Sequence, residues 1–337
     1  MARPAQVVVL GGGSWGTTVA SIVAQNVPTT LWAREKETVA EINTRHRNSV
    51  YLPDLDLTPA LRATTDLPAA VAGADLLIVA IPSKAFRSVV ALAAEHLRPW
   101  VPVVSLVKGI ERTTHKRMTQ IVAELLPRNP AGVLSGPNIA REVANGFAAA
   151  ATLAMPDHQT ALMIQPILRT TLFRVYTSTD VVGAEIAGAL KNVYALAVGF
   201  GDGLEAGDNT RAMVITRSLR ELTRLGMAMG GDEATFAGLA GMGDLIATCT
   251  SPLSRNRYVG FELAKGRSVD EIVGGMHQVA EGVTTSAVVM ELGAHYGVEL
   301  PIAAEVDAVI NHGQPVEGAY RGLLRQAPGH EVHGTQW

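Results

Sequence analysis

A glycine-rich turn near the N-terminus constrains the fold of this chain more than any other segment. The spacing GxGxxG, formed by Gly11, Gly13 and Gly16, directly follows a strand-like run at residues 6–10. Apolar residues at helical spacing come after it, at positions 15, 19, 22 and 23. A strand, a tight turn and a helix in this order are typical of the first unit of a doubly wound α/β sheet.

In this context the turn predicts a binding site for the pyrophosphate of a dinucleotide. Gly11 permits the tight turn, Gly13 lets the backbone approach the phosphates, and Gly16 allows close packing of the helix on the sheet. The helix N-terminus supplies unpaired N–H groups, so Ser14 and Trp15 are expected beside the phosphates. A tight turn without a ligand is the alternative, but the position between strand and helix favours the binding site.

The end of the second strand-like run bears on which dinucleotide binds. Residues 29–33 lead into Arg34, where an NAD-specific site usually offers a carboxylate to the ribose. The Arg34 guanidinium, with Lys36 close by, can pair with the 2′-phosphate of NADP. Glu35 is compatible with NAD, and Arg34 as an ordinary surface arginine is the structural alternative. The sequence therefore favours NADP(H) and keeps NAD(H) as the alternative.

The remaining pattern predicts two domains, residues 1–180 and 181–337, because 337 residues exceed what one hydrophobic core usually organises. The first is predicted as a doubly wound, parallel-rich Rossmann-like sheet with strands at 6–10, 29–33, 75–80, 102–107, 131–135, 148–154 and 173–177. The second is predicted as all-α, with helices at 184–200, 212–225, 234–239, 284–296 and 302–311. The first domain would bind the dinucleotide and the second the substrate.

Composition excludes several classes of protein. The net charge of −3 argues against broad nucleic-acid binding, and the apolar runs are interrupted or too short to span a bilayer. The N-terminus lacks the features of a signal peptide. Cys249 is the only cysteine, so no intramolecular disulfide forms. We therefore expect a soluble, cytoplasmic protein without membrane insertion, and we predict no metal site.

Lys191 is the candidate general acid/base. It stands in an otherwise apolar helical run, and its neighbours at helical spacing are apolar. Burial without an anionic partner disfavours the ammonium and would lower the pKa of the lysine toward the range useful for proton transfer. The alternative is a lysine whose stem packs while its head reaches water. Spacing alone does not decide between them.

Two further segments follow predicted strands, Lys108-Gly109-Ile110-Glu111 and Ser135-Gly136-Pro137-Asn138. In a doubly wound sheet such strand ends face the ligand crevice. Lys108 can offer a point charge to a phosphate or polarise a carbonyl, and the backbone at Gly136 can approach a ligand closely. Ordinary turns between strand and helix are the alternative.

In the second domain a carboxylate, Asp244, precedes a donor-rich cluster by about ten residues. The cluster consists of Ser254, Arg255, Asn256 and Arg257. Arg255 with its neighbours suits bidentate recognition of a phosphate. The alternative is a solvated basic turn.

The ordered set of motifs resembles the bacterial NAD(P)-dependent glycerol-3-phosphate dehydrogenase family. The matching segments are residues 11–16, 106–111, 135–137, 187–193, 241–245, 254–257 and 279–282. Each motif is modest alone, but their joint order and spacing are specific. The resemblance implies reversible hydride transfer between a nicotinamide and C2 of dihydroxyacetone phosphate, which gives sn-glycerol 3-phosphate for phospholipid synthesis. It also implies that Lys191 is the proton acceptor, and it suggests a homodimer.

The resemblance further assigns contacts position by position. The cofactor contacts that it implies, beyond the glycines, are Ser14, Trp15, Arg34, Tyr51, Lys108, Ala140, Arg255, Val279 and Glu281. The substrate contacts that it implies are Lys108, Gly136, Lys191, Asp244, Ser254, Arg255 and Asn256. Asn138 departs from the family pattern, since relatives usually carry serine or threonine there. Its amide is larger than a hydroxyl but can still hydrogen-bond to substrate.

Three other interpretations fit parts of the pattern. A β-hydroxyacid dehydrogenase would share the two-domain plan and the helix lysine, but its carboxylate substrate would leave the phosphate cluster without a purpose. A non-enzymatic redox sensor would bind the nucleotide without needing Lys191 or Asp244. Catalysis through Cys249 lacks a neighbouring histidine or activating motif.

Overall fold

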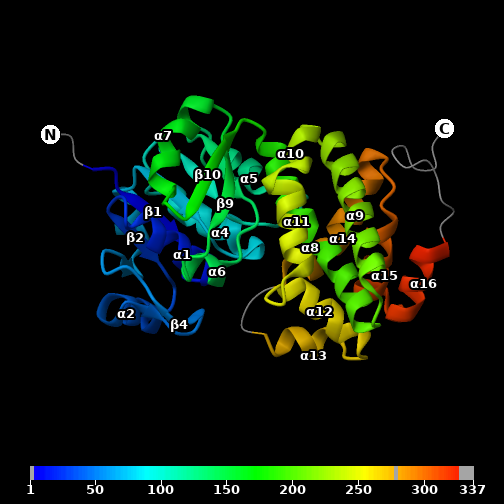
Figure 1. The fold of residues 1–337 in the computed structure, drawn as a ribbon. Coiled ribbons are helices and arrows are strands. Elements are labelled where there is room, and N and C mark those ends of the chain that lie inside the picture. The colour runs from blue at the N-terminus through cyan, green and yellow to red at the C-terminus, as the bar shows by residue number, and fades with distance from the viewer. Residues whose placement is uncertain (1–3, 277–279, 326–337) are drawn as a thin grey trace.

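A β-sheet covered by helices and a bundle of helices lie side by side in this molecule (Figure 1). The computed structural model describes residues 4–276 and 280–325. The last strand of the sheet ends at Ser178, and the bundle begins at Val181. Within the described residues after that point only helices and loops occur. The predicted order, a Rossmann-like sheet followed by an all-helical region, is therefore confirmed.

The sheet has eight strands in the order β10-β9-β8-β7-β6-β1-β2-β5. These are β1 (Val7–Leu10), β2 (Thr29–Trp32), β5 (Arg62–Thr64), β6 (Leu76–Val79), β7 (Val103–Ser105), β8 (Ala131–Ser135), β9 (Ala149–Ala154) and β10 (Phe173–Ser178). Neighbouring strands are parallel except β8 and β9, which are antiparallel. Consequently β9 and β10 run against the other strands, and the sheet is mixed but mostly parallel.

Both faces of this sheet are buried, as its apolar strands require. Along β1, Val7 and Val9 join one hydrophobic cluster, while Val8 and Leu10 join the cluster on the other side. Successive side chains of a strand point to opposite faces, so each face needs its own cover. One cover is α1 (Ser14–Val23), α2 (Lys36–Arg45), α6 (Ala140–Ala144) and α7 (His158–Leu168). The other is α3 (Leu67–Ala72), α4 (Ser83–Ala94) and α5 (Met118–Leu125).

Every predicted strand is present, and three short ones were missed. The hairpin of β3 (Arg47–Asn48) and β4 (Leu52–Asp56) lies outside the main sheet, and β5 forms one of its edges. These strands are short and largely polar, so they carry no run of apolar residues that periodicity could detect.

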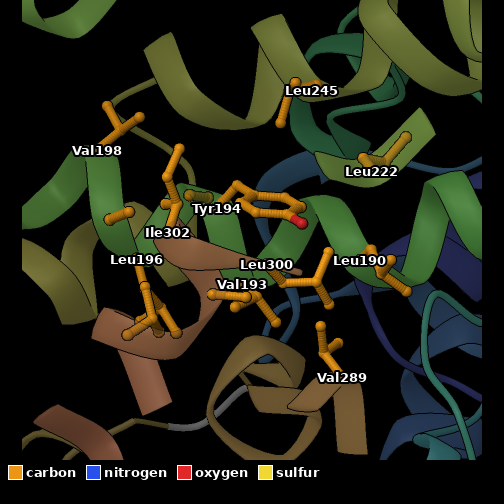
Figure 2. Packing of buried hydrophobic residues seen from close by; sticks show 14 of the residues in the cluster. Leu190, Val193, Tyr194, Leu196, Val198, Leu222, Leu245, Val289, Leu300 and Ile302 are labelled. Carbon is orange, nitrogen blue, oxygen red and sulfur yellow. The ribbon is translucent and has the colours of Figure 1, made fainter. Parts of the chain in front are cut away.

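The bundle is built around one long helix, α8 (Val181–Gly203), which carries Lys191. Asp180 caps its N-terminus by accepting a hydrogen bond from the Gly183 N–H at 2.8 Å. Leu190, Val193 and Tyr194 of α8 project into a core that neighbouring helices close, as Figure 2 shows. Among the described residues, α8 is the one helix long and apolar enough to cross a membrane, but it is mostly buried and is the core helix of this bundle.

The other helices pack around α8 and include several that the sequence did not predict. They are α9 (Asp208–Ala228), α10 (Glu233–Ala237), a π-helical turn at Leu239–Gly243, α11 (Asp244–Thr250), α12 (Arg255–Ala264), α13 (Val269–Gly274), α14 (Glu281–Tyr296), α15 (Pro301–His312) and α16 (Val316–Arg325). Two glycines let α12 lie against α8. A Cβ on Gly260 would lie 2.2 Å from the Leu196 carbonyl oxygen, and one on Gly199 would lie 2.2 Å from the Arg257 carbonyl oxygen. This close contact fixes the start of α12, the predicted phosphate cluster, near the helix that carries Lys191.

Candidate active site

The three motif glycines occupy different surroundings in the turn between β1 and α1. Gly11 has a φ of 121°, and a Cβ there would lie 2.4 Å from the Ala80 carbonyl oxygen. A Cβ on Gly16 would lie 2.1 Å from the Gly11 carbonyl oxygen. By contrast, a Cβ on Gly13 would meet no atom within 4 Å. Backbone packing therefore accounts for Gly11 and Gly16, whereas open space at Gly13 fits the close approach of a pyrophosphate.

Ser14 and Trp15 form the first turn of α1, where backbone N–H groups lack helical partners. The Thr18 hydroxyl links this turn to α6, since it lies 2.8 Å from the Ser14 carbonyl and 3.3 Å from the Ala140 carbonyl. The Trp15 indole packs edge-on against Phe173, with 6.1 Å between ring centroids. Its buried Nε1 has no hydrogen-bond partner among the described residues. Ser14, Trp15 and Ala140 thus gather at one helix N-terminus.

Arg34 stands at the end of β2 with its side chain 85% exposed. Its guanidinium lies 2.8 Å from the Glu35 carboxylate, and this hydrogen bond raises the pKa of Arg34. Tyr51, in the turn before β4, lies close enough to contribute to the same increase in pKa. Such an exposed ion pair is weak and leaves Arg34 accessible to an anion.

Lys108, Lys191 and Asp244 form a charge cluster at the boundary between sheet and bundle, in which Lys108 is partly buried and the other two are buried. The Lys108 Nζ lies 2.6 Å from Asp244 Oδ2, and the Lys191 Nζ lies 3.1 Å from Asp244 Oδ1. The side chains of Lys191 and Asp244 are only 6% and 3% exposed. Residues distant in sequence therefore share one carboxylate, which accounts for the close approach of two ammonium groups.

The pKa of Lys191 is lowered to about 8. Burial is the main cause, and the Lys108 charge acts in the same direction, whereas Asp244 opposes both. Asp244 is an anionic partner of Lys191, which the argument from its apolar helical neighbours did not include. The predicted lowering nevertheless occurs because burial outweighs the ion pair. The alternative of a head that reaches water is also wrong, as the Nζ is enclosed.

Thr248 is a residue of this centre that the sequence did not reveal. Its hydroxyl accepts a hydrogen bond from the Lys191 Nζ and donates one to Asp244 Oδ1 at 3.3 Å. Thr248 lies one turn after Asp244 on α11, so the helical spacing i, i+4 is the signal that could have found it. The threonine and the aspartate together fix the position of the lysine ammonium.

The end of β8 borders this cluster. The Gly136 carbonyl accepts a hydrogen bond from the Lys108 Nζ at 2.9 Å, and a Cβ on Gly136 would lie 3.0 Å from the Ala150 carbonyl oxygen. Both polar atoms of the Asn138 carboxamide are buried without a hydrogen-bond partner among the described residues. Unpaired buried amides are costly, so this geometry fits a carboxamide that bonds to a ligand.

Asn256 connects three helices beside the lysine. Its Nδ2 donates to Asn192 Oδ1 at 2.9 Å, and its Oδ1 accepts from the Gly282 N–H at 3.0 Å. The Asn192 Nδ2 in turn donates to the Lys108 carbonyl at 3.1 Å. Part of the Asn256 carboxamide is therefore engaged within the protein, and it leaves one amide hydrogen for another acceptor.

The predicted phosphate cluster is a helix N-terminus and not a basic turn. Ser254 caps α12 by accepting a hydrogen bond from the Arg257 N–H at 3.3 Å, and Arg255 is the first helical residue. The Arg255 side chain is exposed, yet desolvation by the surrounding protein lowers its pKa, while Glu281 acts in the opposite direction. Arg257 belongs elsewhere, because it pairs with Asp202 at 2.5 Å. A helix N-terminus with an arginine suits a phosphate.

Glu281 reaches from the bundle to the sheet. Its carboxylate accepts hydrogen bonds from the Ser83 N–H at 3.1 Å and the Ser83 hydroxyl at 2.6 Å, at the N-terminus of α4. Val279, the other predicted cofactor contact in this segment, lies outside the described residues.

Two other chemistries find no support here. Cys249 is buried and its pKa is raised to about 12, so it is a poor nucleophile. Within the described residues, no group of three or more His, Cys, Asp or Glu side chains converges as a metal site. The groups that do converge are a lysine of lowered pKa, a second lysine, a carboxylate, an orphaned amide and a helix N-terminus. Such a set can transfer a proton and hold an anion.

Comparisons with known proteins match this architecture over nearly the whole chain. Family models described as NAD-dependent glycerol-3-phosphate dehydrogenase N-terminus and C-terminus match residues 6–161 and 180–321. The glycerol-3-phosphate dehydrogenase (NAD(P)+) of Mycobacterium avium (strain 104) is 60% identical over 334 residues, covering 99% of this chain and 98% of that protein. The corresponding protein of Thermobifida fusca (strain YX) is 48% identical, covering 98% of this chain and 99% of that protein.

Solved structures give the same result. The crystal structure of glycerol-3-phosphate dehydrogenase from Coxiella burnetii has a TM-score of 0.92 at 33% identity, covering 96% of this chain and 99% of that chain. A 3-hydroxyisobutyrate dehydrogenase from Salmonella typhimurium has a TM-score of 0.51 at 15% identity, covering 91% of this chain and 93% of that chain. That likeness shows a shared fold alone, which explains why a hydroxyacid dehydrogenase fitted parts of the sequence pattern. The chain belongs to the NAD(P)-dependent glycerol-3-phosphate dehydrogenase family of oxidoreductases.

Proposed function

We propose that this protein catalyses the reversible NAD(P)H-dependent reduction of dihydroxyacetone phosphate to sn-glycerol 3-phosphate, with Lys191 as general acid/base. The single observation that carries the proposal is the buried Lys191 ammonium, held by Asp244 and Thr248, with a pKa of about 8. At this pKa both protonation states are populated near neutral pH, as a reversible reaction requires.

The proton and the hydride have separate sources. The reduced nicotinamide supplies the hydride to C2 of the substrate when it is bound. Lys191 donates a proton to the carbonyl oxygen as the carbonyl becomes an alcohol, and in the oxidative direction it accepts the hydroxyl proton. The hydride and the proton together account for the two electrons and two hydrogens that convert the carbonyl to the alcohol. Asp244 holds the lysine in place, and the Thr248 hydroxyl orients it by accepting a hydrogen bond from its ammonium.

The substrate phosphate is proposed to bind at the start of α12. Arg255 supplies a bidentate cation and the helix N-terminus supplies N–H groups, with Ser254 and Asn256 beside them. Lys108, Gly136 and Asn138 border the remaining part of the substrate. Phosphate binding at one end fixes C2 against the nicotinamide, so binding energy remote from C2 aids the reaction there.

The cofactor is proposed to lie along the glycine turn, with its pyrophosphate at Gly13 and the N-terminus of α1. The contacts proposed for it are Gly11, Gly13, Ser14, Trp15, Gly16, Arg34, Tyr51, Lys108, Ala140, Arg255, Val279 and Glu281. NADP(H) is favoured over NAD(H) because the exposed Arg34 guanidinium suits a 2′-phosphate. Glu281 now bonds to Ser83, so its contact with the cofactor requires that it share or exchange this partner.

Several wider roles accompany this activity. We propose a cytoplasmic enzyme that supplies glycerol 3-phosphate for phospholipid synthesis and works as a homodimer. We also propose that residues 1–180 form the dinucleotide-binding domain and residues 181–337 the helical substrate-binding domain, which agrees with the change from strand to helix between Ser178 and Val181.

The direct test measures the oxidation of NADPH, and in parallel of NADH, in the presence of each candidate carbonyl substrate. We expect turnover with dihydroxyacetone phosphate and little with carboxylated carbonyl compounds of similar size. Turnover that prefers the carboxylated compounds would contradict the substrate assignment. Cofactor binding without turnover on any of them would contradict the enzymatic role.

A further inference from the structure

Asn48 is a fully buried polar residue beside the glycine turn, and it comes from a hairpin outside the main sheet. It ends β3, which lies about thirty residues beyond the glycine motif in sequence and carries no recognisable signature. The site described above assigns it no part. Its contacts nevertheless converge on the residue that precedes Gly13.

The Asn48 Nδ2 donates to the Gly12 carbonyl oxygen at 2.8 Å and to the Thr17 hydroxyl at 2.8 Å. The Thr17 hydroxyl lies 3.2 Å from the same Gly12 carbonyl oxygen and donates to it. Both side chains are completely buried. A carbonyl group held by two buried donors cannot rotate freely, so the peptide between Gly12 and Gly13 has a fixed orientation.

This orientation determines where the Gly13 N–H points. In a planar trans peptide, the carbonyl oxygen and the following N–H lie on opposite sides of the C–N bond. Holding the Gly12 oxygen toward Asn48 therefore directs the Gly13 N–H away from the hairpin. A Cβ on Gly13 would meet no atom within 4 Å, so there is open space for a ligand beside this residue.

We propose that Asn48 is a positioning residue that fixes the Gly13 amide to donate to the cofactor's pyrophosphate. The inference rests on the proposed binding of that pyrophosphate at the glycine turn. Asn48 itself does not touch the cofactor. It acts through the Gly12–Gly13 peptide, and Thr17 shares the task. A preset donor binds an anion without the cost of reorienting the backbone at the moment of binding.

The proposal predicts a selective loss of cofactor affinity. In Asn48→Ala the Kd for NADPH should rise about tenfold, since a charge-assisted hydrogen bond is weakened. Asn48→Asp should raise it further, because the carboxylate replaces a donor with acceptors against the Gly12 carbonyl. The KM for dihydroxyacetone phosphate and kcat at saturating cofactor should change less than twofold.

A matched control separates positioning from simple loss of stability. Asn129 is 8% exposed, and its Nδ2 also donates to backbone carbonyls, those of Arg98 and Val101, at 2.8 and 2.9 Å. Asn129→Ala should lower Tm as Asn48→Ala does but leave the Kd for NADPH unchanged. If Asn48→Ala does not fold, Thr17→Val removes one donor to Gly12 and should raise Kd a few-fold, and Thr17→Ser should restore it.

The Kd of the full-length enzyme for NADPH, measured by NADPH fluorescence, tests whether Asn48 positions the Gly13 amide. An unchanged Kd in the Asn48 and Thr17 variants, together with a raised Kd in Gly13→Ala, would overturn the role of Asn48 and leave the glycine site intact. An unchanged Kd for NADPH in the Asn48, Thr17 and Gly13 variants alike would overturn the placement of the pyrophosphate itself. A raised Kd in the Asn48 variants and not in Asn129→Ala supports the proposal.

Discussion

The glycine turn is built from residues that are adjacent in sequence, whereas the lysine centre is built from residues that are far apart in sequence. The turn uses residues within a span of six positions, and its geometry follows from one strand, one bend and one helix. The lysine centre joins Lys108, Lys191 and Asp244, which come from the loop after β7 and from two helices. A local site can be recognised from a short motif. A dispersed site exists only after the sheet and the bundle have packed together.

The two regions also differ in what burial does. At the turn, Gly13 faces open space, and the donors proposed to bind the cofactor are backbone N–H groups, which do not titrate. At the lysine centre, burial changes the chemistry of a side chain and lowers the pKa of Lys191 to about 8. Variants of the turn should therefore alter cofactor affinity, and variants of the centre should alter turnover. The predictions below test this division, beginning with the largest effect.

Lys191→Ala should have the largest effect, because it removes the proposed proton donor. We expect kcat to fall about a thousandfold, within the usual contribution of general acid catalysis. Cofactor Kd, measured by fluorescence, should stay near the wild-type value. Turnover within a few-fold of wild type would exclude Lys191 as the general acid/base.

Asp244→Asn should rank second. It leaves the Lys108 and Lys191 ammonium groups beside each other without their shared carboxylate, so we expect kcat to fall about a hundredfold. Asp244 raises the pKa of Lys191, and its removal should lower that pKa further. The acid form would then be lost at lower pH, and the kcat/KM profile for reduction should shift down the pH scale. A profile that stays in place would contradict the pairing.

Gly13→Ala should have a smaller effect, confined to the cofactor. The new methyl group meets no protein atom, so Tm should hold, while the Kd for NADPH should rise about tenfold through contact with the pyrophosphate. Gly16→Ala is the matched control, since its Cβ would lie 2.1 Å from the Gly11 carbonyl oxygen and should lower Tm. An equal decrease in Tm in both variants would show that Gly13, like Gly16, is needed for close packing of the backbone.

Arg34→Ala should have the smallest effect, because an exposed guanidinium forms weak ion pairs. We expect the ratio of kcat/KM for NADPH to that for NADH to fall about fivefold, with NADH turnover little changed. Steady-state assays with both cofactors measure this ratio. An unchanged preference for NADPH would remove Arg34 from the recognition of the 2′-phosphate.

The same contrast between local and dispersed features explains which elements of the fold could be predicted from the sequence. The strands of the sheet that are rich in apolar residues, such as Val7–Leu10 and Leu76–Val79, were all found, because burial on both faces leaves a clear signal. The short strand Arg62–Thr64 leaves none. The helix Arg255–Ala264 was missed because its first turn is polar and basic, and its capping by Ser254 appears only in three dimensions.

The candidate residues of the lysine centre came from their sequence context and from the family resemblance, but neither revealed how these residues contact one another. Nothing in the sequence indicates that Lys108 and Asp244, which lie 136 positions apart, share a hydrogen bond. Thr248 belongs to no motif and was absent from the prediction. Asn48 contacts the glycine turn from a hairpin that periodicity did not detect. Contacts between distant elements are therefore the part of the site that only the fold supplies.

The pH dependence of kcat/KM for reduction of dihydroxyacetone phosphate tests the central claim most directly, namely that Lys191 donates the proton from a buried site of lowered pKa. A general acid must be protonated, so the rate should fall as pH rises through about 8. In Lys191→Arg, whose guanidinium stays protonated, any residual kcat/KM should not fall over this pH range. A fall in kcat/KM near pH 8 that persists unchanged in Lys191→Arg would contradict the role of Lys191 as proton donor. A wild-type profile without this fall would contradict it as well.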